Sequence, residues 1–190
     1  MSLINVSALR RTLLCALLTS QLLSGVQACV TDCSIPVNFI GTYNDETCLV
    51  MVNNASSIET VTLPKISTAS LSQDGSEAGS VPFTVTLTDC PASRTVTLFF
   101  NSSASAADGD TGNLRNDGGS GYSRGVQIRI RKENNDRTII DEPTSGQDYV
   151  IPAAGDAVSH RFTASYYAKG NSAVTAGRVH TVAGVDLVYK

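Results

Sequence analysis

Apolar and polar residues alternate with a period of two in several short stretches of this chain. The clearest cases are residues 81–88 and 126–131, where nearly every second side chain is apolar. Successive side chains of a strand point to opposite faces, so this pattern predicts strands with one buried face. We expect further strands at residues 48–52, 57–63, 95–100, 137–140, 161–168 and 185–189.

Turn-forming residues separate these stretches. Residues 108–125 contain six Gly together with several Asp and Asn, which predicts a long, mobile loop. Residues 141–146 and 170–177 form shorter breaks, and signals for helices are nearly absent. Many short strands between such turns predict an all-β sandwich, and one uniform composition indicates one domain.

The first 28 residues follow a different pattern. Arg10 and Arg11 precede an apolar stretch at residues 13–23, and a small residue, Ala28, ends the segment. These are the features of a secretory signal peptide, with cleavage expected between Ala28 and Cys29. The apolar stretch is too short to cross a membrane, and no other segment reaches about 18 apolar residues. We therefore expect an exported protein with no integral membrane segment.

The cysteines agree with export. Cleavage would leave Cys29, Cys33, Cys48 and Cys90, and an even number in an exported chain predicts disulfides. Of three possible pairings, the economical one joins Cys48 to Cys90 and closes a small ring between Cys29 and Cys33. Lipidation of Cys29, which directly follows the expected cleavage site, is the alternative for that residue.

Charge and residue inventory exclude other functions. The formal net charge is −3, and the longest basic cluster is at residues 129–132, which argues against nucleic acid as a partner. His160 and His180 are the only histidines, and neither accompanies a nucleophile motif, so we expect no enzymatic activity. Residues 108–113 lack the terminal glutamate of a calcium loop, and no CxxC pair suggests zinc. We expect no metal and no cofactor.

Three local patterns follow one another along the expected mature chain. The first is Val37-x-Phe39-x-Gly41 followed by Cys48, and the second is the alternating stretch that ends in Cys90. The third is Phe162-x-Ala164-x-Tyr166-Tyr167-Ala168 with Gly170, followed by a last strand in which Tyr189 is penultimate. In this order, the chain resembles the pilin subunits of chaperone–usher fimbriae, in the type 1 fimbrial protein family.

The resemblance implies an incomplete immunoglobulin-like β-sandwich that lacks its final strand and is completed by donor-strand exchange. Residues 29–44 would be the N-terminal donor-strand extension, and residues 45–190 the pilin domain. The implied partners are a periplasmic pilus chaperone, an outer-membrane usher and neighbouring pilin subunits. The protein would pass through the periplasm to the bacterial surface and form part of a fimbria.

The resemblance also assigns roles to residues. It implies a disulfide between Cys48 and Cys90, the pair that the family normally has, whereas Cys29 and Cys33 are additional. Pro36 lies inside the expected donor strand and offers no N–H to a ladder. The donor face would be Ile35, Val37, Phe39, Gly41 and Tyr43, and the acceptor groove, or chaperone-facing strand, would be Val185, Leu187, Tyr189 and Lys190.

Alternatives remain at this point. Residues 35–43 could form an ordinary first strand of a closed sandwich. The protein could be a minor or tip adhesin that binds a host glycan, although Trp is absent and the chain is too short for a separate lectin domain. A secreted enzyme is the third alternative, which the residue inventory disfavours.

Overall fold

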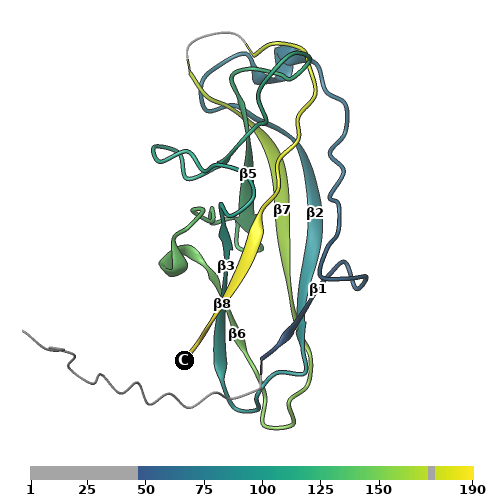
Figure 1. Cartoon of the computed structure of the whole chain (residues 1–190), viewed down its shortest axis with the longest axis vertical. Coiled ribbons are helices and arrows are strands. Elements are labelled where there is room, and N and C mark those ends of the chain that lie inside the picture. Colours follow the sequence, from purple (N-terminus) through teal and green to yellow (C-terminus); the bar gives the residue numbers. More distant parts are fainter. Residues whose placement is uncertain (1–46, 171–173) are drawn as a thin grey trace, which may run out of the picture. The chain divides into compact units, whose positions relative to one another are not determined.

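Two antiparallel β-sheets make up the part of the chain that the computed structural model describes, residues 47–170 and 174–190 (Figure 1). The chain divides into two units, Met1–Tyr43 and Asn44–Lys190, and every described residue belongs to the second. The expected signal peptide with its cleavage site, the extension at 29–44, the donor residues 35–43 and the pair Cys29 and Cys33 lie outside the described residues.

The first sheet has five strands and the second has three, so the expected all-β class is confirmed. The order in the first is β1 (Leu49–Val52), β2 (Glu77–Thr88), β7 (Val158–Ala168), β5 (Val126–Lys132) and β4 (Leu114–Arg115). The order in the second is β6 (Gln147–Val150), β3 (Thr95–Asn101) and β8 (Gly184–Tyr189). Two short 3-10 turns, Thr68–Leu71 and Pro143–Ser145, complete the described elements.

The core lies between the two sheets and is filled by the apolar face of each alternating strand. Phe83 and Phe162 stack with ring centroids 5.6 Å apart, and the ring of Phe100 in the other sheet meets that of Phe162 edge-on at 5.3 Å. Tyr149 of β6 is fully buried, and its hydroxyl donates a hydrogen bond to the carbonyl of Val85 in β2 (3.0 Å). Aromatic packing and this hydrogen bond therefore tie the two sheets together.

Two of the expected strands do not form. Residues 57–63 have an extended apolar pattern but no ladder partner, and Val61 and Leu63 pack directly against the core instead. Residues 137–140 contribute only an isolated bridge between Arg137 and Arg131. In both places, the alternating pattern reports burial of one face, which does not by itself require a neighbouring strand.

The expectation of a mobile loop at residues 108–125 is wrong. The segment contains β4, and Asp108 and Asn113 within it are almost completely buried. Hydrogen bonds from the Asp108 N–H to the Asn113 carbonyl and from the Gly112 N–H to the Asp108 carbonyl close a compact turn. The polar residues that suggested a loop therefore form hydrogen bonds with one another and pack against the sheet.

No helix in the described part of the chain is long and apolar enough to cross a membrane.

Candidate functional site

The last strand, β8, lies at an edge of the three-stranded sheet. It pairs with β3 from Val96 opposite Tyr189 to Asn101 opposite Gly184, and the Lys190 N–H donates to the carbonyl of Thr95 (2.9 Å). Within the described residues, no strand pairs with the other side of β8. That side therefore presents a row of backbone donors and acceptors without a ladder, which is a template for an added strand.

Half-buried apolar side chains accompany this unpaired side. Val185 and Leu187 of β8 point toward the core but are only partly covered, whereas Val188 on the opposite face of the strand is exposed. Apolar residues of β1 and of the extended segment after it, among them Val50 and Val61, are likewise only partly buried against the core. We call the unpaired side of β8, with Val185 and Leu187, the open edge.

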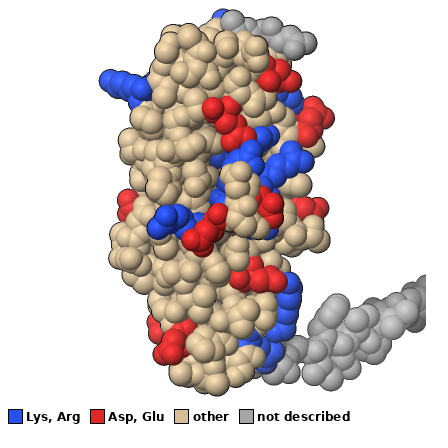
Figure 2. All heavy atoms as spheres, turned by 180° about the vertical axis from the view of Figure 1, so that it is seen from behind, with Lys and Arg blue, Asp and Glu red and all other residues tan. Residues whose placement is uncertain are grey.

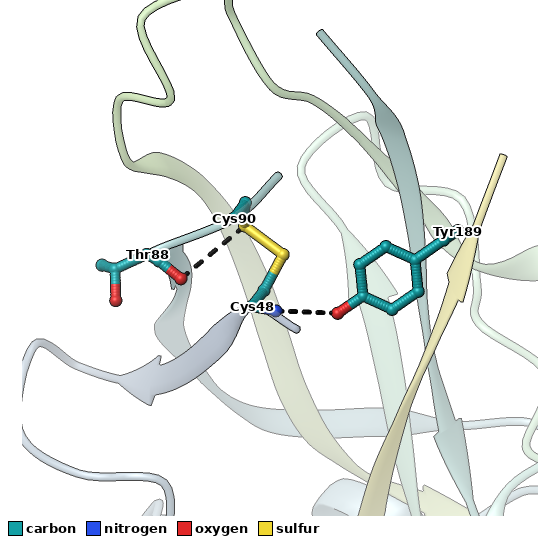
Figure 3. The surroundings of a disulfide bond; sticks show 4 residues. All are labelled: Cys48, Thr88, Cys90 and Tyr189. Carbon is teal, nitrogen blue, oxygen red and sulfur yellow. Dashed lines mark hydrogen bonds between the residues drawn. A yellow bond between two sulfur atoms is a disulfide. The ribbon is translucent and has the colours of Figure 1, made fainter. Parts of the chain in front are cut away.

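A disulfide and a tyrosine mark one end of the open edge (Figure 3). Cys48, just before β1, is bonded to Cys90, just after β2, and their Cα atoms are 4.2 Å apart. The expected Cys48–Cys90 disulfide is thereby confirmed, and it joins the ends of two paired strands. The Tyr189 ring reaches over from β8, and its hydroxyl accepts a hydrogen bond from the Cys48 N–H (2.8 Å).

The residue after Tyr189 is also held in place. The Lys190 ammonium lies 3.1 Å from the carboxylate of Asp148 on β6, which the Thr97 hydroxyl of β3 also reaches. The Thr97 hydrogen bond, assisted by Lys190, lowers the pKa of Asp148 below its usual range. Side chains from β6 and β3 thus hold the residue that follows β8 on the sheet. Of the expected acceptor residues, Val185, Leu187 and Tyr189 lie on one face of β8, and Lys190 directly follows the strand.

The outer face of the five-stranded sheet carries a second feature, a continuous polar network. Arg129 is buried, lies 3.8 Å above the ring of Tyr167 and donates to Glu77 (2.6 Å). Arg131 also donates to Glu77, so the charge of this half-buried carboxylate is shared by two guanidinium groups. Burial alone raises the pKa of Glu77, but the bonds from Arg131 and Arg129 outweigh it and leave the pKa lowered.

The network continues through side-chain amides to a second carboxylate. Arg129 donates to Asn113 (3.1 Å), and Asn113 donates to Gln127 (2.9 Å), which also accepts from Thr111. The Thr111 N–H and the Lys169 ammonium both donate to Asp108, the ammonium at 2.6 Å. The named members of the polar network are Glu77, Asp108, Thr111, Asn113, Gln127, Arg129, Arg131, Ser165 and Lys169.

Asp108 is the most perturbed acid of this network. Burial raises its pKa, but the hydrogen bond and charge of Lys169 and the donors of Thr111 outweigh burial and lower the pKa to about 2. Lys169 also contacts Asp110 (2.9 Å), so one ammonium group pairs with both acids of residues 108–113. In the view of Figure 2, basic and acidic atoms lie side by side in a strip, and most of the remaining surface carries neither.

The two histidines lie apart and have different surroundings. The His160 ring packs edge-on against Tyr149 (4.6 Å between centroids), and His180 contacts the carboxylate of Asp117 (2.7 Å). Neither forms a hydrogen bond with a Ser, Thr or Cys side chain of the described residues, and those residues contain no cluster of metal-ligating side chains.

Sequence reasoning missed two parts of this arrangement. It did not anticipate the hydrogen bond between Cys48 and Tyr189, because residues 141 positions apart meet only through the packing of the two sheets. It also read 129–132 simply as a basic cluster. The available signal was the alternation itself, which puts Arg129 and Arg131 on the same face of β5 as Gln127.

Comparison with known proteins identifies the type of subunit. A family model described as "Fimbrial protein" matches residues 37–190. The serotype 2 fimbrial subunit of Bordetella pertussis is 30% identical over 174 residues, covering 78% of this chain and 83% of that protein. The major fimbrial subunit SMF-1 of Stenotrophomonas maltophilia is 27% identical over 158 residues, covering 80% of this chain and 90% of that protein.

Solved structures show the same fold. The match to the P pilus rod subunit PapA has a TM-score of 0.57 at 18% sequence identity. It covers 75% of this chain and 99% of PapA. A subunit in the structure of a chaperone–usher pilus has a TM-score of 0.56 at 19% identity, covering 85% of this chain and 98% of that one. The chain therefore belongs to the fimbrial protein family and is a structural, non-enzymatic pilus subunit that is exported to the cell surface and assembles there with other pilins.

Proposed function

We propose that this subunit polymerises by strand exchange, in which residues 35–43 of one subunit add to the open edge of its neighbour. The unpaired side of β8 is the observation that carries the proposal. It offers backbone groups to an incoming strand, and Val185 and Leu187 beside it offer apolar surface that is only half covered. A strand with alternating apolar side chains satisfies both requirements at once.

Residues 35–43 have the composition that such a strand needs. Ile35, Val37, Phe39 and Tyr43 belong to one series of alternate positions, and two of the four residues of the other series, Asn38 and Thr42, are polar. Gly41 in the same series leaves room for a close approach of the two backbones. The donor face therefore matches the chemistry of the open edge, and the other face of the donor strand can meet water.

The same open edge explains the need for other partners. A subunit with an unpaired strand edge and half-covered apolar side chains is prone to unspecific association before it reaches a neighbour. We therefore include in the proposal a periplasmic chaperone that covers the edge first and an outer-membrane usher where the donor strand replaces the chaperone. Residues 1–28, as a secretory signal, would bring the chain to that compartment.

The test places charge on the donor face. Replacing Val37 and Phe39 together by Asp would bring two carboxylates against the apolar open edge, and burial of an unpaired charge costs several kcal/mol. We expect a stable complex of subunit and chaperone but no fibres by electron microscopy, and no ladder of subunits on a gel run without boiling.

The matched control places the same charges on the other face of the strand. Asn38→Asp with Thr42→Asp should leave fibres intact, because these side chains alternate with the donor face. If the Val37→Asp, Phe39→Asp chain instead unfolds as an isolated subunit, residues 35–43 belong to its own sandwich and the proposal is wrong.

A glycan-binding role finds no comparable support. A surface depression of about 630 Å³ is lined by residues from 102–112 and 139–141 that include no aromatic side chain for stacking on a sugar. Its two carboxylates already have partners within the chain: Asp108 bonds Lys169, and Asp141 accepts from both the N–H and the hydroxyl of Ser102.

A further inference from the structure

A surface depression of about 300 Å³ lies where the edge strand β4 meets β5 in the five-stranded sheet. Its lining comes from residues 115–118 and 123–127 and from Lys169. β4 is at the opposite edge of this sheet from β1, and β8 belongs to the other sheet. The depression therefore shares no residue with the open edge, and its chemistry needs an explanation of its own.

Gln127 lines this depression although the residue is only 5% exposed. Its side-chain oxygen accepts hydrogen bonds from Asn113 (2.9 Å) and from Thr111 (2.7 Å). Its NH2 group has no hydrogen-bond partner among the described residues. Buried polar groups in folded proteins are nearly always hydrogen-bonded, and one without a partner costs free energy. This amide therefore points to an acceptor that the described chain does not supply.

The orientation of the Gln127 amide is fixed by its neighbours. The Arg129 guanidinium can only donate, so the side-chain atom of Asn113 that it contacts at 3.1 Å must be the oxygen. The Asn113 NH2 group is then the donor to Gln127, which must accept with its own oxygen. Neither Asn113 nor Thr111 lines the depression, so the Gln127 NH2 group is turned away from them and toward it.

Two arginines add further donors to the same depression. Arg115 is directly opposite Gln127 in the β4–β5 register, so the two side chains are neighbours on one face of the sheet. The Arg115 guanidinium has no hydrogen bond with a described residue, and its ion pair with Asp108 is long (3.4 Å). Arg124, just before β5, has neither an ion pair nor a side-chain hydrogen bond within the described ranges. Both guanidinium groups are therefore available to a ligand.

Other polar side chains of the lining already have partners. The Lys169 ammonium is held by two carboxylates (2.6 and 2.9 Å), and the Asn116 NH2 group donates to two backbone carbonyls. The carboxylate of Asp117 contacts His180 (2.7 Å). The side-chain groups that remain are hydrogen-bond donors, and two of them carry positive charge. A ligand that satisfies them must offer several acceptor atoms and negative charge.

We propose that this depression is a binding site for an oxyanion, such as a carboxylate or a sulfate group, with Arg115, Arg124 and Gln127 as its donors. A guanidinium presents parallel N–H groups to two oxygens of such an anion, and the charge of the acceptor strengthens each hydrogen bond. The volume of about 300 Å³ also leaves room for part of a molecule that bears the anion. The inference does not depend on strand exchange, because the site lies within one subunit.

Equilibrium dialysis of fibres of the full chain against radiolabelled sulfate and acetate tests the site. We expect saturable binding of at least one of these anions, with one site per subunit. Galacturonate, which bears a carboxylate on a sugar, distinguishes two sources of the anion. Tighter binding of galacturonate than of acetate indicates an anion carried by a saccharide, and equal binding indicates a free anion. Galactose, which lacks the carboxylate, should not bind.

Two variants remove donors from the site. Arg124→Met changes an exposed position, and we expect binding at least about tenfold weaker, because a hydrogen bond to a charged group is lost. Gln127→Glu keeps an acceptor for Asn113 and Thr111 but replaces the NH2 group by a carboxylate oxygen, so binding should be abolished. Thermal unfolding shows whether each variant is folded.

Arg94→Met is the matched control, because Arg94 is an exposed arginine between β2 and β3 that does not line the depression. It should bind the anions as the wild type does. If Gln127→Glu does not fold, Arg115→Met replaces it, with the same loss of about tenfold expected as for Arg124→Met.

The inference is overturned if wild-type fibres show no saturable binding of sulfate, acetate or galacturonate. It is also overturned if the folded variants at the site bind like the wild type, if Arg94→Met weakens binding equally, or if galactose binds as well as galacturonate. Failure of strand exchange appears elsewhere, as fibres that persist in the Val37→Asp, Phe39→Asp chain. The two proposals therefore fail independently.

Discussion

The outer face of the five-stranded sheet and the open edge beside β8 differ in how their polar groups find hydrogen-bond partners. On the sheet face, Arg129, Glu77 and Asp108 are removed from water, and each has partners within the chain. At the open edge, the outer side of β8 lacks a described partner strand, and Leu187 remains half covered. The charged groups of the first region are paired within the described residues, and the second region is, in our proposal, completed by the donor strand of a neighbouring subunit.

This difference predicts where mutations act. A change in the polar network leaves a buried charge without its partner, and the cost falls on the stability of the subunit itself. A change at the open edge affects a surface that, in our proposal, other chains use, so we expect its cost to fall on capture and assembly. Variants of the two regions should therefore separate when stability and assembly are measured side by side.

The largest effect is expected at the open edge. Leu187→Asp places a carboxylate on the face of β8 that points toward the core and, in our proposal, toward both chaperone and donor strand. We expect the subunit to be degraded in the periplasm and to be absent from immunoblots of that compartment. Val188→Asp, one residue later and on the exposed face, should accumulate normally. Equal accumulation of the two variants would show that β8 has no such role.

The next effect concerns the disulfide that joins the ends of β1 and β2. Replacing Cys48 and Cys90 together by Ala removes a cross-link over 42 positions, which costs about 4 kcal/mol of unfolding free energy in a chain-entropy account. Urea titration of the refolded, monomeric chain measures it. Because the loss arises from the missing cross-link itself, reduction of the wild-type chain should have the same effect, and a loss below 1 kcal/mol would contradict this.

A change within the polar network should cost slightly less. Arg129→Met removes one of the two guanidinium groups from Glu77 and leaves Asn113 without its donor, so we expect a loss of about 3 kcal/mol. Arg124→Met, an exposed position without an ion pair among the described residues, should change stability by less than about 0.5 kcal/mol. Any fibres that Arg129→Met subunits form should look like wild type, since the open edge is untouched.

The smallest expected effect is the loss, at acidic pH, of the contribution of Asp108 to the free energy of unfolding. The pKa of Asp108 is about 2 in the folded chain, against an ordinary value of 3.8, so its stabilising contribution is complete above pH 4 and disappears as the pH falls to 2. The contribution is about 2 kcal/mol. Unfolding free energies of the wild type and Asp108→Asn, measured from pH 5 to 2, should converge as the pH falls. Replacing the exposed Asp156 by Asn should leave the wild-type curve unchanged.

The same two regions show what a sequence can predict. The strand β8 and the disulfide near its end could be predicted from the sequence. Apolar and polar residues alternate regularly in β8, and the cysteines allow few pairings. The polar network was not, because its contacts join Glu77 to Arg129 and Asp108 to Lys169 across strands whose order in the sheet no local pattern specifies. The prediction of a strand at residues 57–63 was wrong for a related reason. Local alternation shows which face of a segment is buried, but it does not show whether a neighbouring strand pairs with that segment.

The distance in sequence between β3 and β8 also governs when the subunit can fold. β3, at residues 95–101, has β8 at residues 184–189 as one of its two neighbours, so about 90 residues must be present before this pair can close. Cys48 must likewise wait for Tyr189, at the opposite end of the described chain, before its amide is satisfied. During export from the N-terminus onward, the three-stranded sheet therefore remains unfinished until β8 has crossed, and pairings over such distances typically form in milliseconds to seconds rather than microseconds. One side of β3 thus stays without its strand partner until β8 arrives, even after β6 has paired with the other side, which makes late folding a property of the topology.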